Sequence, residues 1–335
     1  MAEGYFCRLG RPMTEFEIIK RYFAASPVQR EDVVLGIGDD AALVAVPPGS
    51  GLVVSVDTLV ANVHFPAATD PADIGYKALA VNLSDMAAMG AEPGWATLAL
   101  TLPRVDELWL AEFSKGFWEL AERFGVCLVG GDTCRGDLSV TVQVMGHMPL
   151  GTALRRDGAA VGDLIFVTGT LGDAGLGLQL IQGAGGVTLN ESERGLVVQR
   201  LNRPTPRVAV GRALVGVASA AIDVSDGLVA DLGHILRASG VGATLNAPLL
   251  PLSSAVERAV AERISWSLPL AAGDDYELCF TVPSRLRDEA MSRMAQVGCP
   301  AACVGQIESQ AGLRLRKDDG ALIDLDVTEG YRHFG

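Results

Sequence analysis

The most informative hydrophobic pattern in the chain is an apolar stretch at 77–90, with the sequence KALAVNLSDMAAMG. Read with the period of an α-helix, this stretch predicts a helix that is apolar on most sides and therefore buried. Asp85 stands near its middle, on the same side as Ala78, Asn82 and Met89. Burying a carboxylate without a partner is costly. Asp85 therefore either pairs with an internal structural partner or faces a cleft and binds a cation.

Hydrophobic periodicity along the rest of the chain predicts a mixture of short strands and helices. Helical spacing of apolar residues predicts helices at 15–23, 107–124, 196–201 and 206–217. Apolar, partly β-branched runs predict strands at 52–59, 96–102, 126–129, 138–144 and 164–168. The length of 335 residues fits two domains. The segment 148–162, which contains Pro149, Gly151 and Gly158, is the predicted boundary region, giving domains at 14–149 and 150–335.

Acidic residues recur where apolar segments give way to glycine or to a loop. Ser55 and Asp57 stand two apart in the strand predicted at 52–59, so both side chains project from one face. A hydroxyl and a carboxylate on one face provide part of the oxygen shell that a hard cation such as Mg²⁺ prefers. Further candidate ligands at such junctions are Asp40, Asp132, Asp223 and Asp226.

Each of these acids also has an ordinary structural explanation. Gly-Asp pairs are common in turns, and a polar residue after a strand often caps the next helix. Ser225 or Asp226, for example, could cap the helix that runs through Leu228. Capping explains one of these residues well, and the trio with Asp223 less well. The residue pattern alone leaves both the structural and the cation-binding interpretation open.

Composition narrows the classes of function. The formal net charge of −13 argues against a nucleic-acid surface or an anionic membrane as partner, and a phosphate substrate would need cations to offset repulsion. No apolar run is long enough to span a bilayer, and the N-terminus does not have the pattern of a signal peptide. The six cysteines are scattered without a CxxC pair, which is typical of free thiols in a reducing compartment. We therefore expect a cytoplasmic protein.

Several common catalytic motifs are missing from the sequence. The histidines are isolated, no zinc spacing or GxxxxGK[ST] loop occurs, and no Ser-His-Asp or Cys-His arrangement stands out. What remains is the set of aspartates, which together could hold Mg²⁺ through oxygen atoms and water. Phosphoryl transfer requires little more than aligned reactants and cations that neutralise the phosphates.

The ordered set of acidic motifs resembles the thiamine-monophosphate kinase family, which belongs to the ATP-dependent superfamily typified by aminoimidazole ribonucleotide synthetase. The resemblance covers nearly the whole chain, from about residue 15 to 334, and it is specific as a set although each motif alone is weak. The motifs are GIGDDAAL (36–43), SVDTLVANVHF (55–65), KALAVNLSDMAAMGAEP (77–93), GGDTCRG (130–136), IDVSDGL (222–228) and GDDYELCF (273–280).

This resemblance implies an α/β fold of two α/β domains and a homodimer in which the N-terminal sheets associate. The first domain would bind ATP and Mg²⁺ near that interface. The implied reaction is phosphorylation of thiamine monophosphate to thiamine diphosphate by direct in-line transfer from ATP, as a step of thiamine diphosphate biosynthesis. Several Mg²⁺ ions would assist, and no residue is assigned as a general base.

The resemblance also implies roles for individual residues. The metal ligands would be Asp40, Ser55, Asp57, Asp85, Asp132, Asp223, Asp226 and the backbone carbonyl of Val56. ATP would contact Gly131, Asp132, Arg156 and Ser225, and the thiamine phosphate pocket would include His64, Asp274 and Tyr331. Many relatives carry Glu where this chain has Asp274, so the shorter side chain leaves that pocket contact open.

Two alternatives remain at this point. One is another ATP-dependent enzyme of the same superfamily, acting on a purine precursor or on selenide; the selenide enzymes need a reactive Cys near a Lys in a glycine-rich loop, and Cys7 has no such setting. The other is a module that binds divalent cations or nucleotide without catalysis. The positions of His64, Arg156 and Tyr331, where acceptor and phosphate contacts are expected, favour the kinase.

Overall fold

The computed structural model of the chain describes residues 13–24, 26–184, 186–262 and 266–327. Its N-terminal half contains a four-stranded sheet in the order β3-β6-β4-β5. Strand β4 pairs in parallel with β5 and antiparallel with β6, and β6 pairs antiparallel with β3. The strands are β3 (Ser50–Val60), β4 (Glu92–Leu102), β5 (Cys127–Arg135) and β6 (Ser139–Pro149).

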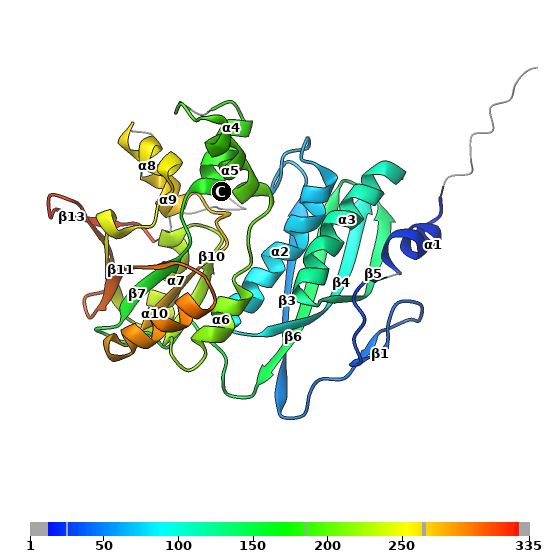
Figure 1. Cartoon of the computed structure of the whole chain (residues 1–335), viewed down its shortest axis with the longest axis horizontal. Coiled ribbons are helices and arrows are strands. Elements are labelled where there is room, and N and C mark those ends of the chain that lie inside the picture. The colour runs from blue at the N-terminus through cyan, green and yellow to red at the C-terminus, as the bar shows by residue number, and fades with distance from the viewer. Residues whose placement is uncertain (1–12, 25, 185, 263–265, 328–335) are drawn as a thin grey trace, which may run out of the picture.

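Two long helices, α2 (Pro71–Met89) and α3 (Glu107–Phe124), cover one face of this sheet (Figure 1). They approach closely because both carry glycine at the crossing. A Cβ on Gly116 would lie 1.8 Å from the Ala72 carbonyl oxygen, and one on Gly75 would lie 2.1 Å from the Phe113 carbonyl oxygen. Glycine at these positions is therefore a packing requirement between the helices.

A short N-terminal segment precedes the sheet. Thr14 caps α1 (Glu15–Ile18) through a capping box with Glu17, and the helix continues as a π-helical turn, η1 (Ile19–Phe23). The helix predicted at 15–23 is thus confirmed, as an α-helical turn followed by a π-helical turn. A small hairpin of β1 (Val33–Leu35) and β2 (Leu43–Val44) holds the loop that contains Asp40.

The C-terminal half is built on a seven-stranded mixed sheet in the order β13-β12-β9-β11-β7-β10-β8. The strands are β7 (Leu164–Thr168), β8 (Ala220–Val224), β9 (Gly242–Asn246), β10 (Glu277–Val282), β11 (Ala301–Glu308), β12 (Gly312–Arg316) and β13 (Leu322–Leu325). The helices are α4 (Asp173–Ile181), α5 (Glu191–Asn202), α6 (Val208–Leu214), α7 (Leu228–Ser239), α8 (Ser254–Ala261), α9 (Ser267–Ala271) and α10 (Arg287–Gln296), with short 3-10 turns η2 (Ala247–Leu249) and η3 (Ser284–Leu286).

The two halves share one hydrophobic core, in which α2 lies between the sheets (Figure 1). Leu79, Leu83 and Met86 of α2 are fully buried, as the apolar pattern predicted. The same cluster includes Phe166 and Phe280, which stack on each other on one face of the C-terminal sheet. The opposite face of that sheet packs against α7. An acidic residue on α2 can therefore meet residues from both halves.

Three expectations about local structure need correction. The helix predicted at 77–90 begins earlier, at Pro71, because Asp70 accepts a hydrogen bond from the Ala72 N–H and acts as its N-cap. The strand predicted at 126–129 does not end at the glycines but continues to Arg135 as β5, with Gly131 in a positive-φ conformation. Neither Ser225 nor Asp226 caps α7, because Gly227 occupies that position without a side-chain cap.

No helix in the described ranges combines the length and apolar character needed to cross a membrane. This agrees with the absence of a long apolar run in the sequence.

Candidate active site

The site is organised around Asp85, which α2 presents toward the neighbouring strand β3. The Ser55 hydroxyl of β3 donates a hydrogen bond to Asp85 Oδ2. Two residues further along β3, the Asp57 N–H donates a hydrogen bond to Asn82 Oδ1 of α2 at 3.1 Å. Ser55 and Asp57 thus lie on the same face of β3, as their spacing predicted.

The other side of α2 meets the C-terminal half through Asp223 at the end of β8. The Ser84 hydroxyl donates to Asp223 Oδ2 at 2.8 Å, and Asp223 is only 5% exposed. Ser84 and Asp85 are adjacent on the helix, so the helix links the carboxylates of the two halves. Sequence reasoning missed Ser84, because a serine in a buried helix has no distinctive pattern.

The loop after β8 is shaped by Asp231 of α7. Its Oδ2 accepts hydrogen bonds from the N–H groups of Ser225, Asp226 and Gly227, at 3.0, 3.0 and 3.1 Å. This arrangement takes the place of the cap considered from the sequence, and Ser225 and Asp226 both line the cavity between the halves. A carboxylate one helical turn inside α7 gives no sequence signal for this role.

Burial and mutual repulsion dominate the electrostatics of this cluster. Burial, together with the charges of Asp85 and Asp226, raises the pKa of Asp57 to about 6. Burial, with further contributions from Asp85 and Asp57, raises the pKa of Asp223 to about 7. Burial also raises the pKa of Asp85, opposed by the Ser55 hydrogen bond and the charge of Arg156. A bound cation would relieve this repulsion.

The acidic cluster opens into a cavity of about 1000 Å³ between the halves. Asp57, Asp85, Asp223 and Asp226 line it, and so do the predicted acceptor residues His64 and Asp274. His64 is oriented by the Val60 N–H, which donates to its Nδ1 at 2.9 Å. Tyr331, also predicted for this pocket, lies outside the described residues.

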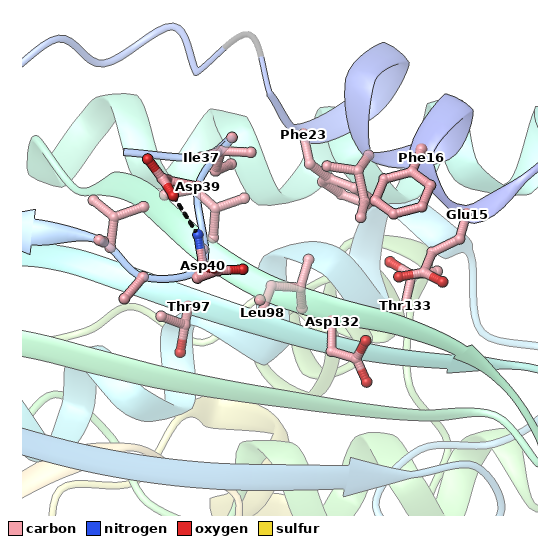
Figure 2. Close-up of a pocket in the computed structure, with 18 residues that line it drawn as sticks. Glu15, Phe16, Phe23, Ile37, Asp39, Asp40, Thr97, Leu98, Asp132 and Thr133 are labelled. Atoms are coloured by element: carbon pink, nitrogen blue, oxygen red, sulfur yellow. Dashed lines mark hydrogen bonds between the residues drawn. The ribbon is translucent and has the colours of Figure 1, made fainter. Parts of the chain in front are cut away.

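Asp40, Gly131 and Asp132 lie elsewhere, in a second cavity of about 580 Å³. Figure 2 shows Asp40 on the loop between β1 and β2, Asp132 on β5, and the rings of Phe16 and Phe23 beside them. The Asp40 N–H donates to Asp39 Oδ1 at 3.0 Å. Strands β3 and β5 form opposite edges of the sheet, three strand spacings or roughly 14 Å apart. Within one chain, these residues do not join the cluster around Asp85.

Val56 and Arg156 occupy the margins of the site. The Val56 side chain is 58% exposed, on the face of β3 opposite to Asp57, so that only its backbone could serve as a ligand. Arg156 is exposed on the segment that follows β6. Its charge lowers the pKa of both Asp85 and Asp223, which places its guanidinium within electrostatic reach of the cluster.

The chemistry of the site fits hard divalent cations that also bind substrate oxygens and water. The donors are carboxylates and a hydroxyl, the ligands that Mg²⁺ prefers, and Mg²⁺ is usually held by one or two carboxylates plus phosphate. Among the described residues, no three acidic, histidine or cysteine side chains converge closely enough to hold an ion by themselves. Burial, and for Asp57 and Asp223 also the neighbouring carboxylates, raises the pKa values of these groups, and bound cations would offset both effects.

Comparison with known proteins agrees with this fold. Residues 38–148 match the AIR synthase related protein, N-terminal domain, and residues 160–318 match the AIR synthase related protein, C-terminal domain. The chain therefore belongs to the AIR synthase related proteins. A thiamine-monophosphate kinase of Salmonella typhimurium (strain LT2) is 49% identical over 321 residues, which cover 96% of this chain and 98% of that protein. Within the class, the chain belongs to the thiamine-monophosphate kinase family.

Solved structures give the same result. A thiamine-monophosphate kinase from Stenotrophomonas maltophilia K279a matches with a TM-score of 0.80 and 47% identity, covering 87% of this chain and 92% of that one. A structure of AaThiL complexed with AMPPCP and TMP matches with a TM-score of 0.74 and 30% identity, covering 87% and 89%. The α/β fold that the sequence implied is confirmed.

Proposed function

We propose that this protein is a thiamine-phosphate kinase, which transfers the terminal phosphoryl group of ATP to thiamine monophosphate and forms thiamine diphosphate. The observation that carries the proposal is the acidic cluster of Asp57, Asp85, Asp223 and Asp226 in the wall of a cavity large enough for both reactants. Membership of the family supports it, as does the relative solved with AMPPCP and TMP.

The proposed chemistry is direct in-line transfer. Several bound Mg²⁺ ions would supply charge neutralisation on the phosphates as the transition state forms. Asp57, Asp85, Asp223 and Asp226 would hold them, with Ser55 orienting Asp85 through its hydrogen bond. The acceptor is a phosphate oxygen that is largely ionised at neutral pH, so no residue needs to remove a proton from it.

The remaining residues would bind and orient the reactants. Gly131, Asp132, Arg156 and Ser225 would contact ATP, and Asp40 with Asp132 would add metal ligands from the second cavity. His64 and Asp274 would line the acceptor pocket, because both face the cavity that holds the acidic cluster. Tyr331 is proposed for the same pocket on the resemblance alone.

We also propose a homodimer formed by the N-terminal sheets, in a cytoplasmic protein. The face of β3 that is turned away from α2 exposes three apolar side chains, Leu52, Val54 and Val56, at 49%, 49% and 58%. An exposed apolar row of this kind is typical of an interface. Association there would also explain how Asp40 and Asp132 could complete a site with the β3 residues of another copy.

The test is an assay of purified protein with Mg²⁺, ATP and thiamine monophosphate, read as formation of thiamine diphosphate. Free thiamine and aminoimidazole precursors serve as parallel acceptors. Product from thiamine monophosphate alone is the expected result. ADP release without thiamine diphosphate would refute the acceptor and indicate another substrate of the superfamily. Magnesium binding without ATP consumption would refute the kinase and favour a binding module.

A further inference from the structure

Lys77 is a buried cation in the wall of the main cavity, and the proposed chemistry gives it no role. It is 3% exposed, on the same helix as Asp85. Lys77, Val81 and Asp85 stand four residues apart and all line the cavity, so one face of α2 forms this wall. Among the described residues of the lining, Lys77 is the single lysine or arginine, beside five aspartates.

The Lys77 ammonium contacts Asp274 from the other half of the chain. Lys77 Nζ lies 3.2 Å from Asp274 Oδ2, and the Tyr276 hydroxyl donates to Asp274 Oδ1 at 3.1 Å. Both carboxylate oxygens are therefore held, each by a different side chain. The Lys77 contact has no signal in the sequence, because residues 77 and 274 are brought together only by packing of α2 on the C-terminal half.

The backbone of Asp274 is constrained as well. It has a φ of 62°, in the left-handed region that is uncommon for residues other than glycine. Its N–H donates to the Ser225 carbonyl at 2.8 Å. Such conformations persist where the surroundings over-determine them, and they concentrate at functional sites. Asp274 is thus fixed in both main chain and side chain.

The pair is unequal in exposure. The Lys77 side chain is 4% exposed and that of Asp274 is 30% exposed, so the ammonium lies beneath the carboxylate and the carboxylate faces the cavity. A ligand that enters the cavity meets Asp274 before it meets Lys77. This order favours a role for Lys77 that acts through Asp274. A buried ammonium is less suited to direct contact with an anionic group of the ligand.

We propose that Lys77 is a positioning residue for acceptor recognition: it holds Asp274 in the orientation that binds the cationic, hydrogen-bond-donating ring portion of the acceptor. The inference rests on the proposed function, in which the acceptor has a thiazolium and aminopyrimidine part and a phosphate part. A carboxylate complements the first and repels the second. Lys77 therefore contributes to affinity for the rings, whereas Mg²⁺ and the other residues of the proposed site would bind the phosphate.

The experiment measures calorimetric binding of free thiamine and of thiamine monophosphate to the full chain. The two ligands share the ring portion and differ in the phosphate. The variants are Lys77→Met, which keeps the apolar stem, Asp274→Asn, and the double variant. Lys115→Met is the matched control, since Lys115 is an exposed lysine on α3. The Michaelis constant for ATP is measured in parallel, and thermal unfolding verifies the fold of each variant.

The expected result is that Lys77→Met weakens binding of thiamine and of thiamine monophosphate by the same factor, roughly tenfold or more. The Michaelis constant for ATP stays unchanged, and Lys115→Met binds like the wild type. Because Lys77 acts through Asp274, the double variant binds both ligands like Asp274→Asn alone. If Lys77→Met does not fold, the comparison of Asp274→Asn with the double variant still shows whether Lys77 acts through Asp274.

Three outcomes would overturn the inference. Loss of affinity for thiamine monophosphate only would indicate a direct phosphate contact. Additive losses in the double variant would show that Lys77 acts independently of Asp274. Unchanged affinity in folded Lys77→Met would show a purely structural pair. In each of these cases the wild type still phosphorylates thiamine monophosphate, so the proposed function survives. A wild type that binds neither ligand refutes both.

Discussion

Replacing Asp223 with asparagine tests the central electrostatic argument. Burial and the neighbouring carboxylates raise the pKa of Asp223 from 3.8 to about 7. The folded state therefore binds this proton more tightly than the unfolded state does. Stability is highest below the unfolded pKa and is lost as the pH rises from 3.8 toward 7. At about 1.4 kcal/mol for each pKa unit, the ionised carboxylate costs on the order of 4 kcal/mol at pH 8.

Asp223→Asn removes this charge and keeps the shape and one acceptor for the Ser84 hydroxyl. In magnesium-free buffer at pH 8, we expect the variant to be more stable than the wild type by a few kcal/mol, a gain that nearly disappears at pH 4. Added Mg²⁺ should stabilise the wild type and should stabilise the variant much less, because the wild-type cluster is the one that cations relieve. Catalysis should fall at the same time.

The assay is urea unfolding at pH 4 and pH 8, with chelator and with Mg²⁺. Asp163→Asn is the matched control, since Asp163 is equally buried at 5% exposure and is held by the Ser219 hydroxyl and the Ala160 N–H, away from the cavity. Destabilisation by Asp223→Asn at pH 8 without Mg²⁺, or Mg²⁺ stabilisation equal to that of the wild type, would refute the reasoning.

Three further predictions follow from the structure. Asp85→Asn should leave the fold intact and lower kcat/KM by the equivalent of about 3–4 kcal/mol, measured in the thiamine diphosphate assay; unaltered turnover would contradict a metal role for α2. Arg156→Gln should raise the Michaelis constant for ATP and leave that for thiamine monophosphate unchanged, and equal effects on both would contradict its assignment. Gly116→Ala should cost about 1–3 kcal/mol or more of unfolding free energy, because its Cβ would meet the Ala72 carbonyl. Gly195→Ala is the control, with open space around it, and a similar loss there would contradict the packing argument.

Local pattern was enough to predict most of the elements. The helix α3 and the strand β7 have the predicted limits. In two of the elements whose limits were predicted wrongly, a single residue decided the boundary. Asp70 starts α2 before the apolar pattern begins, and Gly131 lets β5 continue past the point where glycine predicted its end.

The candidate site was likewise predictable from the sequence only in part. The residue pattern was enough to show that Asp85, in an apolar helix, would be costly to bury without a cation or partner, and that Ser55 and Asp57 share one face of a strand. Which of the candidate residues lie close together depends on how the two halves pack. The tertiary structure brings Asp223 to Ser84, beside Asp85, while it leaves Asp40 and Asp132 in a separate cavity at the other edge of the sheet.

The sequence pattern reports properties of single segments, whereas the site depends on contacts between segments. Periodicity reports burial, which is a property of one segment, and it therefore reveals α2 and the carboxylate within it. Pairing between segments depends on how α2 packs between two sheets, and the hydrogen bonds of Asp231 and the contact of Lys77 with Asp274 arise only from that packing. The family resemblance indicated which residues belong to the site, and the tertiary structure showed which other residues contact them.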